Sequence, residues 1–287
     1  MVKNYIKLLR ISHWVKNTFV FVPLVFSKNL TEFDVFVTVF LAAAAFSAAS
    51  SIVYIINDIT DIENDRAHPQ KKNRPLASGA VSIRSAVITV TILSIVLVIL
   101  LSFCNIEFII TVAGYTFLNI LYSFSLKKIV IVDLISIATG FMLRIIGGAL
   151  VIDVYISNWL ILTTLFLSLF LAIMKRKSEI GLNIQNSESR TVLRDYTVEF
   201  IDQLSSISAA GIIICYALYS VSERTTVFFG TENLVFTTIF VIFGVFRYMF
   251  LVYTQNKGES TIEILISDIP TILNTLLYIF VIILIIY

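Results

Sequence analysis

The sequence predicts an all-α integral membrane protein with nine transmembrane helices. The 287 residues are 58% hydrophobic and only 14% charged, whereas a soluble domain of this length carries about a quarter charged residues. The mean hydropathy is +0.93. Apolar stretches long enough to cross a bilayer, roughly 17 to 25 residues, recur throughout the chain. We therefore expect a single transmembrane domain over residues 1–287.

The expected spans follow one another along the whole chain. They cover residues 17–30, 33–56, 84–103, 107–124, 130–152, 157–174, 199–221, 232–253 and 268–286. The first is short, and the ninth contains Pro270. Two connections on one side are long, residues 57–83 and 175–198. Because long loops on one face of a compact bundle often carry function, we expect a reaction site at that face.

The basic residues predict the orientation of these spans. Of the 21 lysines and arginines, only Lys28 and Arg224 fall outside when the N-terminus is placed in the cytoplasm, and Arg144 and Arg247 lie within spans. Cytoplasmic loops of membrane proteins are enriched in lysine and arginine. The sequence therefore predicts a multi-pass cell-membrane protein with a cytoplasmic N-terminus, an outer C-terminus and both long loops in the cytoplasm.

A cluster of acids stands at the end of the second span. On a helix, Asn57, Asp58, Asp61 and Asp65 would lie within roughly 100° of arc, with Glu63 on the opposite side. Like charges this close repel by a few tenths of a kcal/mol per pair. A divalent cation bound between the carboxylates makes their proximity favourable. Mg²⁺ typically binds one or two carboxylates together with substrate phosphates. The spacing thus favours a Mg²⁺ site over a solvated helix end.

Basic residues follow this acidic cluster in the same loop. They are Arg66, Lys71, Lys72 and Arg74. Acids followed directly by bases suit a metal-bound polyanion, whose remaining phosphate oxygens the bases neutralise. A plain cytoplasmic loop would explain the bases equally well, but it would not explain acids that share one face.

The second long loop repeats this pattern in weaker form. Its bases are Lys175, Arg176, Lys177, Arg190 and Arg194. On a helix, Asp195, Glu199 and Asp202 would lie within about 60° of arc. Two readings stay open for these acids: a second metal or substrate site, or acids favoured near a helix start by the macrodipole.

Two arginines lie within the predicted spans. An unpaired arginine in hydrocarbon is costly, so we expect Arg144 to face the bundle interior and meet an acid or a phosphate. Arg247 is nearer the cytoplasmic end of its span. It can extend its head group to the interface or contact a ligand.

The pattern Asn57-Asp58-x-x-Asp61-x-x-x-Asp65 resembles the first aspartate-rich motif of the UbiA superfamily of intramembrane prenyltransferases. Other stretches resemble its decaprenyl-phosphate phosphoribosyltransferase branch. They are Arg10 to Asn17, Asp61 to Pro69, Lys71 to Gly79, Tyr122-Ser123 with Lys127, Phe141 to Gly148, Lys175-Arg176, Tyr196-Thr197 and Arg247-Tyr248. The resemblance implies nine helices around a central cavity, with Mg²⁺ and a diphosphate held near the cytoplasmic face.

The resemblance also implies a reaction. In that branch, 5-phosphoribose moves from phosphoribosyl pyrophosphate to a membrane-embedded polyprenyl phosphate, and pyrophosphate leaves. The alternative is a prenyltransferase that moves a polyprenyl group from its diphosphate to an aromatic or other acceptor. Such enzymes are expected to carry a second Asp-x-x-x-Asp cluster, but here Asp195-Tyr196-Thr197-Val198-Glu199 takes its place. A transporter is disfavoured because the acids lie at a helix end and not near the midplane.

Site roles follow from this resemblance and from the charges. Asp58, Asp61 and Asp65 are the expected catalytic and metal-binding residues, supported by Asn57. Candidates for the donor phosphates are Lys16, Arg66, Lys71, Arg74 and Lys127, and candidates for the acceptor phosphate are Arg144, Lys175, Arg176 and Arg190. Asn17, Tyr196 and Arg247 are further expected substrate-binding residues. The expected partners are the donor, a polyprenyl lipid and the bilayer, with no nucleic acid.

Overall fold

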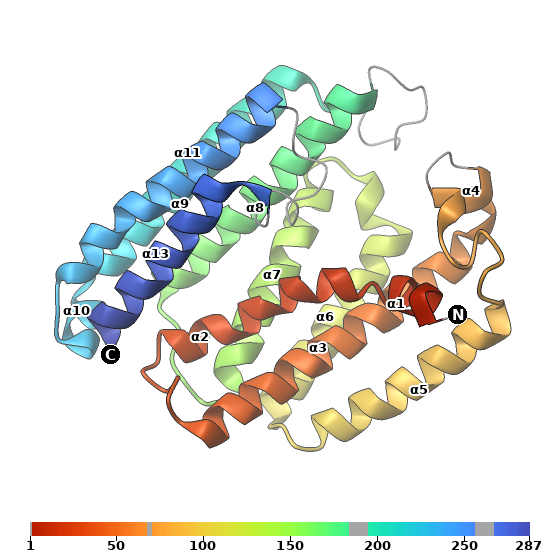
Figure 1. The fold of residues 1–287 in the computed structure, drawn as a ribbon, viewed down its shortest axis with the longest axis horizontal. Coiled ribbons are helices and arrows are strands. Elements are labelled where there is room, and N and C mark those ends of the chain that lie inside the picture. The colour runs from red at the N-terminus through yellow and green to blue at the C-terminus, as the bar shows by residue number, and fades with distance from the viewer. Residues whose placement is uncertain (1, 68–70, 184–194, 256–266) are drawn as a thin grey trace. The chain divides into compact units, whose positions relative to one another are not determined.

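The computed structural model describes residues 2–67, 71–183, 195–255 and 267–287. Within these residues, eight helices are long and apolar enough to cross a membrane. The helices concerned are α3 (Phe33–Thr60), α5 (Ile83–Leu101), α6 (Ile106–Phe124), α7 (Val132–Leu150), α8 (Asn158–Asn183), α9 (Val198–Val221), α11 (Thr238–Gln255) and α13 (Ile269–Ile286) (Figure 1). They correspond to the second through ninth predicted spans, and the all-α transmembrane fold class is confirmed.

The first predicted span takes a different form. Helix α1 (Val2–Leu9) leads into the 3₁₀ helix η1 (Ile11–Phe21), which continues as the short α2 (Val22–Val25). Arg10 separates α1 from η1 in a left-handed backbone conformation, with φ 52° and ψ 48°. The expected count of nine helices is therefore approximate, because a 3₁₀ helix and a four-residue α-helix stand where one α-helical span was predicted.

The chain divides into two compact units. Unit 1 comprises Met1–Ser125 and Leu143–Tyr155, and unit 2 comprises Leu126–Met142 and Ile156–Tyr287. Helix α7 begins in unit 2 and ends in unit 1. The single domain expected from the sequence stays a prediction.

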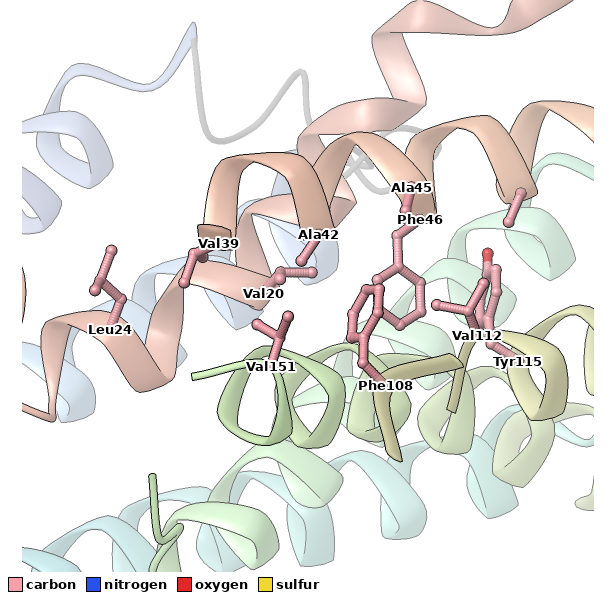
Figure 2. Packing of buried hydrophobic residues seen from close by; sticks show 11 residues of the cluster. Val20, Leu24, Val39, Ala42, Ala45, Phe46, Phe108, Val112, Tyr115 and Val151 are labelled. Carbon is pink, nitrogen blue, oxygen red and sulfur yellow. The ribbon is translucent and has the colours of Figure 1, made fainter. Parts of the chain in front are cut away.

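The core of unit 1 forms where α3 packs against α6, η1 and the end of α7. The Phe46 ring meets Phe108 edge to face, with centroids 5.6 Å apart, and lies 5.3 Å from the Tyr115 ring (Figure 2). A Cβ at Gly148 would lie 2.2 Å from the Val20 carbonyl oxygen, so the glycine permits this close approach. Small residues let helices pack closely in lipid, where apolar burial gives little driving force. This packing sets the position of η1 beside α3.

Unit 2 is built around the long contact between α8 and α9. Buried Phe170, Met174, Ala209 and Ile212 fill this contact. Helix α8 extends to Asn183, although the sequence predicted that its span ends at residue 174. The prediction that a loop begins at residue 175 is therefore wrong.

Three of the predicted loop bases consequently stand on α8. They are Lys175, Arg176 and Lys177. The helix can continue here because Arg176 is compensated by the buried carboxylate of Asp133 and the partly exposed carboxylate of Glu179. Two other predicted loop residues, Arg190 and Arg194, lie outside the described residues.

Candidate active site

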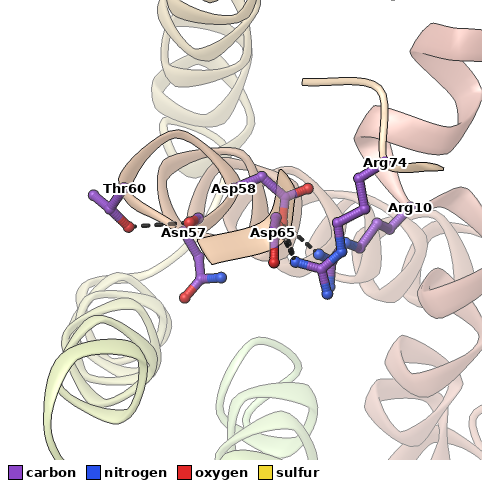
Figure 3. Close-up of polar contacts among 6 residues, drawn as sticks. All are labelled: Arg10, Asn57, Asp58, Thr60, Asp65 and Arg74. Atoms are coloured by element: carbon purple, nitrogen blue, oxygen red, sulfur yellow. Dashed lines mark hydrogen bonds and ion pairs between the residues drawn. The ribbon is translucent and has the colours of Figure 1, made fainter. Parts of the chain in front are cut away.

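The acidic cluster begins on α3 and ends on the short helix α4 (Ile62–Ala67). Asp61 caps α3 with φ −96° and ψ 9°, so the single continuous helix assumed from the sequence is interrupted at this residue. Asp58 and Asp65 nevertheless both accept hydrogen bonds from Arg74 (Figure 3). Glu63 projects into solvent, as expected, and pairs with Arg66 at 3.1 Å.

Arg10 and Arg74 neutralise the two buried carboxylates of this cluster. Arg74 Nη1 donates to Asp65 Oδ2 at 2.6 Å and to Asp58 Oδ1 at 3.1 Å. Arg10 Nη2 donates to Asp58 Oδ1 at 2.6 Å. Both aspartates are 3% exposed, whereas the arginine side chains are 20% and 28% exposed. The acids are thus buried, and their cationic partners reach the surface.

Tyr54 and the backbone together hold Arg10 in place. The Arg10 guanidinium carbon lies 4.6 Å from the centroid of the Tyr54 ring, within cation–π distance. Tyr54 and Asp58 stand one turn apart on α3, so one helix face supplies both contacts. Sequence reasoning assigned Arg10 no role, because its partner is 48 residues away and the left-handed corner that aims it has no clear sequence signal.

A cleft opens beside this cluster in unit 1. It has a volume of about 400 Å³. Its lining residues are Ile6, Lys7, Arg10, Ser12, His13 and Arg74. Since both arginines that hold the acids also line the cleft, a ligand in it would meet their guanidinium groups.

A second polar layer in unit 1 surrounds Arg144, which is buried as predicted. Its Nε donates to Asn17 Oδ1 at 2.7 Å, and its Nη2 donates to the Tyr115 hydroxyl at 2.8 Å. Asn17 in turn donates to Ser47 Oγ at 2.8 Å. The oxygens that accept these two hydrogen bonds from Arg144 are neutral. Tyr115 and Ser47 carried no sequence signal, because each lies in an apolar run.

Lys16 stands just before the buried Asn17. Burial lowers the pKa of Lys16 to about 8, and the positive charges of Arg144 and Arg10 act in the same direction. A lysine in this environment gains most from a bound anion, which offsets all three causes of the lowered pKa.

The donor set in unit 1 fits a magnesium ion. Among the described residues, no group of three or more His, Cys, Asp or Glu side chains is arranged to hold a metal by itself. Mg²⁺, however, usually takes one or two carboxylates and completes its shell with water and substrate phosphates. Asp58 and Asp65 contact the same Arg74 nitrogen, so their oxygens converge on one cation already. Asn57 and Asp61, both partly buried, stand at the same helix end.

The remaining predicted site residues divide between the two units. In unit 1, Arg66 is exposed on α4, and Lys71 begins the 3₁₀ turn η2 (Lys71–Asn73). The others lie in unit 2 and are Lys127 in η3 (Leu126–Lys128), Lys175 and Arg176 on α8, Tyr196 before α9, and Arg247 on α11.

Arg176 forms a sealed pair with Asp133 in unit 2 and also contacts Glu179, whose side chain is 19% exposed. Its Nε donates to Asp133 Oδ2 at 3.0 Å, and its Nη1 donates to Glu179 Oε2 at 2.7 Å. The Tyr196 hydroxyl donates to Asp133 Oδ1 at 2.7 Å and accepts from the Ile131 amide at 2.7 Å. Burial, reinforced by Asp133, raises the pKa of Tyr196, so its phenol stays protonated and remains a donor. Sequence reasoning did not assign Asp133 to any site.

The second acidic group does not form one helical face. Asp195 precedes α9 and is not on it, so the expected face of three acids is wrong for this residue. Glu199 is exposed in the first turn of α9, where the macrodipole favours an acid. Asp202 pairs with Lys177 and accepts from the Tyr253 hydroxyl at 2.9 Å. The helix-start interpretation accounts for Glu199.

Arg247 has a carboxylate partner in unit 2. Its Nε and Nη2 donate to the two Asp268 oxygens at 3.0 and 2.7 Å. Asp268 also caps α13 by accepting from the Thr271 amide at 3.0 Å. Arg247 holds the pKa of Asp268 well below its usual range. The arginine thus joins α11 to the start of α13.

The long apolar helices define a multi-pass membrane protein, and buried carboxylates lie on α3 and α4 near the end of its first long apolar helix. The chain belongs to the UbiA prenyltransferase family, whose model matches residues 18–263. It is therefore a transferase of that superfamily.

Curated relatives and solved structures agree with this family. Decaprenyl-phosphate phosphoribosyltransferase of Mycolicibacterium smegmatis is 32% identical over 228 residues, which are 78% of this chain and 72% of that protein. The protein of the same name from Corynebacterium glutamicum is 31% identical over 229 residues, covering 77% of this chain and 69% of the relative. A UbiA homolog from Archaeoglobus fulgidus bound to GPP and Mg²⁺ matches with a TM-score of 0.72 at 17% identity, over 99% of both chains.

Proposed function

We propose that this protein transfers 5-phosphoribose from phosphoribosyl pyrophosphate to a membrane-embedded polyprenyl phosphate, with Mg²⁺ as cofactor. The observation that carries the proposal is the pair of buried aspartates held by two arginines that line an open cationic cleft. Relatives named decaprenyl-phosphate phosphoribosyltransferase, similar over most of the chain, support the same reaction.

The aspartates and arginines have complementary tasks in this proposal. Asp58, Asp61 and Asp65 would hold Mg²⁺, which when bound neutralises charge that develops on the leaving pyrophosphate. Arg10 and Arg74 then exchange their carboxylate partners for pyrophosphate oxygens. Charge-assisted hydrogen bonds of this kind are about twice as strong as neutral ones. The two arginines thus bind the donor and favour departure of pyrophosphate.

The acceptor requires positioning more than activation. Its phosphate is already anionic, so an acceptor oxygen can form the bond to the ribose C1 while the bond to pyrophosphate breaks, without a strong general base. Arg144, in unit 1, donates to the neutral oxygens of Asn17 and Tyr115, and Lys16 directly precedes Asn17 in the chain. Arg144 is our candidate for the acceptor phosphate, and Lys16 stays a candidate for the donor phosphates. Bringing two polyanions together and excluding water supplies the remaining rate enhancement.

We also propose that the N-terminus and the cleft face the cytoplasm, as the distribution of basic residues predicts. Lys3→Cys, on the exposed side of α1, tests this in intact cells. Protection of this thiol from a membrane-impermeant maleimide supports the orientation. Labelling as complete as in opened cells contradicts it.

The reaction is tested with purified protein in nanodiscs and two labelled donors. We expect label from phosphoribosyl pyrophosphate to enter the lipid phase only when polyprenyl phosphate is present, and a labelled prenyl diphosphate to give no product. Arg74→Ala should lower the rate at least about a hundredfold, because a charge-assisted contact to the leaving group is lost. Arg84→Ala is the matched control, since Arg84 is exposed on α5. Turnover of the prenyl diphosphate alone would overturn the proposal.

A further inference from the structure

Polar side chains other than these two arginines also line the cleft beside Arg10 and Arg74. Of the described residues that line it, Ile6 is apolar, and Lys7, Ser12 and His13 are not. A prenyl chain attached to a diphosphate would need apolar walls next to the diphosphate site. Burying a cation against such a chain without a partner would instead be costly. The lining therefore suits a donor with a second polar or anionic group.

The left-handed corner at Arg10 brings these side chains together. Lys7 lies on α1, and Ser12 and His13 lie on η1, so the turn between the two helices lets both line one cleft. The His13 ring meets Tyr54 edge to face, with centroids 5.4 Å apart. The same Tyr54 ring supports Arg10. A tyrosine on α3 thus fixes two of the lining residues relative to Asp58.

Lys7 supplies a charge that the acidic cluster does not neutralise. Arg10 and Arg74 are paired with Asp58 and Asp65. In the described part of the chain, by contrast, no carboxylate lies within ion-pairing distance of the exposed Lys7. An anion in the cleft would therefore meet a lysine without competition from an acid.

We propose that Lys7, together with Ser12 and His13, forms a subsite for a phosphate monoester, namely the 5-phosphate of the ribosyl donor. The inference rests on the proposed function and deepens it, because the subsite would select a phosphorylated sugar over a prenyl chain. Pyrophosphate occupies Arg10 and Arg74, and the 5-phosphate occupies Lys7. The cleft volume of about 400 Å³ lies within the usual range for small-ligand pockets, about 300–1,000 Å³.

Two phosphate monoesters take part in the proposed reaction, and kinetics can separate them. Lys7→Ala should raise the KM for phosphoribosyl pyrophosphate about tenfold, with little change in kcat and in the KM for polyprenyl phosphate. Lys7→Arg should restore most of the affinity. Lys3→Ala is the matched control, because Lys3 is an exposed lysine on the same helix that does not line the cleft. A rise in the KM for polyprenyl phosphate alone would overturn the inference and assign the subsite to the lipid acceptor.

Binding of ribose 5-phosphate, measured by calorimetry with Mg²⁺ and pyrophosphate present, tests the subsite without turnover. We expect the parent protein and Lys3→Ala to bind it and Lys7→Ala to bind it about tenfold more weakly. Equal binding by all three proteins would overturn the subsite even if phosphoribosyl transfer occurs. Lys7-dependent binding without transfer would sustain the subsite and refute the proposed function.

Discussion

Each unit of this protein contains a cluster of arginines and acids, but the two clusters differ in how they meet the surroundings. In unit 1, Asp58 and Asp65 are buried, while the side chains of Arg10 and Arg74 are 20% and 28% exposed and line a cleft. In unit 2, the side chains of Arg176 and Asp133 are 1% and 0% exposed.

This difference in exposure separates a site that can exchange partners from one that cannot. An arginine at a cleft can leave its carboxylate for an incoming phosphate. A sealed pair is held by the large cost of leaving one buried charge alone, about 3–5 kcal/mol. We therefore interpret the cluster of unit 1 as functional and that of unit 2 as architectural. The sequence grouped Arg176 with the acceptor-binding residues, whereas its contacts with Asp133 and Glu179 favour a structural role.

The largest effect is expected from removing a charge in the open cluster. Asp58→Asn, Asp61→Asn and Asp65→Asn should each lower turnover by about a thousandfold or more at saturating Mg²⁺, because metal neutralisation of the leaving group is lost. Initial rates and gel filtration in detergent measure activity and folding. Glu63→Gln is the control and should be nearly as active as the parent, since its side chain is 82% exposed. Near-normal rates in the aspartate variants would show that these aspartates do not hold the metal ion.

Breaking the sealed cluster should instead affect stability. Asp133→Asn removes the buried carboxylate that pairs with Arg176. We expect a loss of about 3–5 kcal/mol in the free energy of unfolding. The activity of the protein that remains folded should stay within about twofold of the parent. Thermal unfolding in detergent measures the first quantity. A second change, Arg176→Met, should recover part of the loss. An unchanged Tm together with a loss of activity would show that this cluster has a functional role.

A smaller effect is expected from the titration of Lys16. Burial lowers its pKa from the ordinary value of 10.5 to about 8 in the folded protein. Between these values the unfolded chain binds more protons, so the stability contributed by this group rises with pH over that window. Its charge, and with it phosphate binding, falls as pH rises through about 8. We expect kcat/KM to decline above pH 8, and Lys16→Arg to remove this decline. If the pH profile of Lys16→Arg is identical to that of the parent protein, the decline does not arise from the titration of Lys16.

The smallest effect is expected at the start of α9. Glu199→Gln should lower the rate tenfold or less, at most about 1.4 kcal/mol, because the exposed side chain acts on the helix end only. Initial rates with both donors measure this. A loss of activity as complete as in Asp61→Asn would support a second metal site at the start of α9 and, with it, a prenyl diphosphate as the donor.

Much of the transmembrane fold could be predicted because long apolar runs dominate the sequence. The exceptions have local causes. The predicted end of α8 was too early, because the sequence is polar from Lys175 onward. In the structure the helix continues, and Asp133 and Glu179 compensate the charge of Arg176. The first span was predicted as an α-helix, and nothing in its composition signals the 3₁₀ geometry of η1.

The acids of the site could be predicted, but their partners could not. Asp58 and Asp65 are close in sequence, so helical periodicity brings them together despite the break at Asp61. Arg10 and Tyr115 meet the site through tertiary contacts that no local spacing reveals. Lys7 and His13 become relevant only when the corner at Arg10 places them beside the cleft.

The central claim is that the open cluster, and not the sealed one, holds a divalent ion together with the donor. Electron paramagnetic resonance of Mn²⁺, added to purified protein with and without pyrophosphate, tests it most directly. We predict that pyrophosphate tightens Mn²⁺ binding in the parent and in folded Asp133→Asn, and that Asp65→Asn loses this binding. Equal Mn²⁺ binding by Asp65→Asn and the parent, or loss of binding in Asp133→Asn alone, would contradict the account.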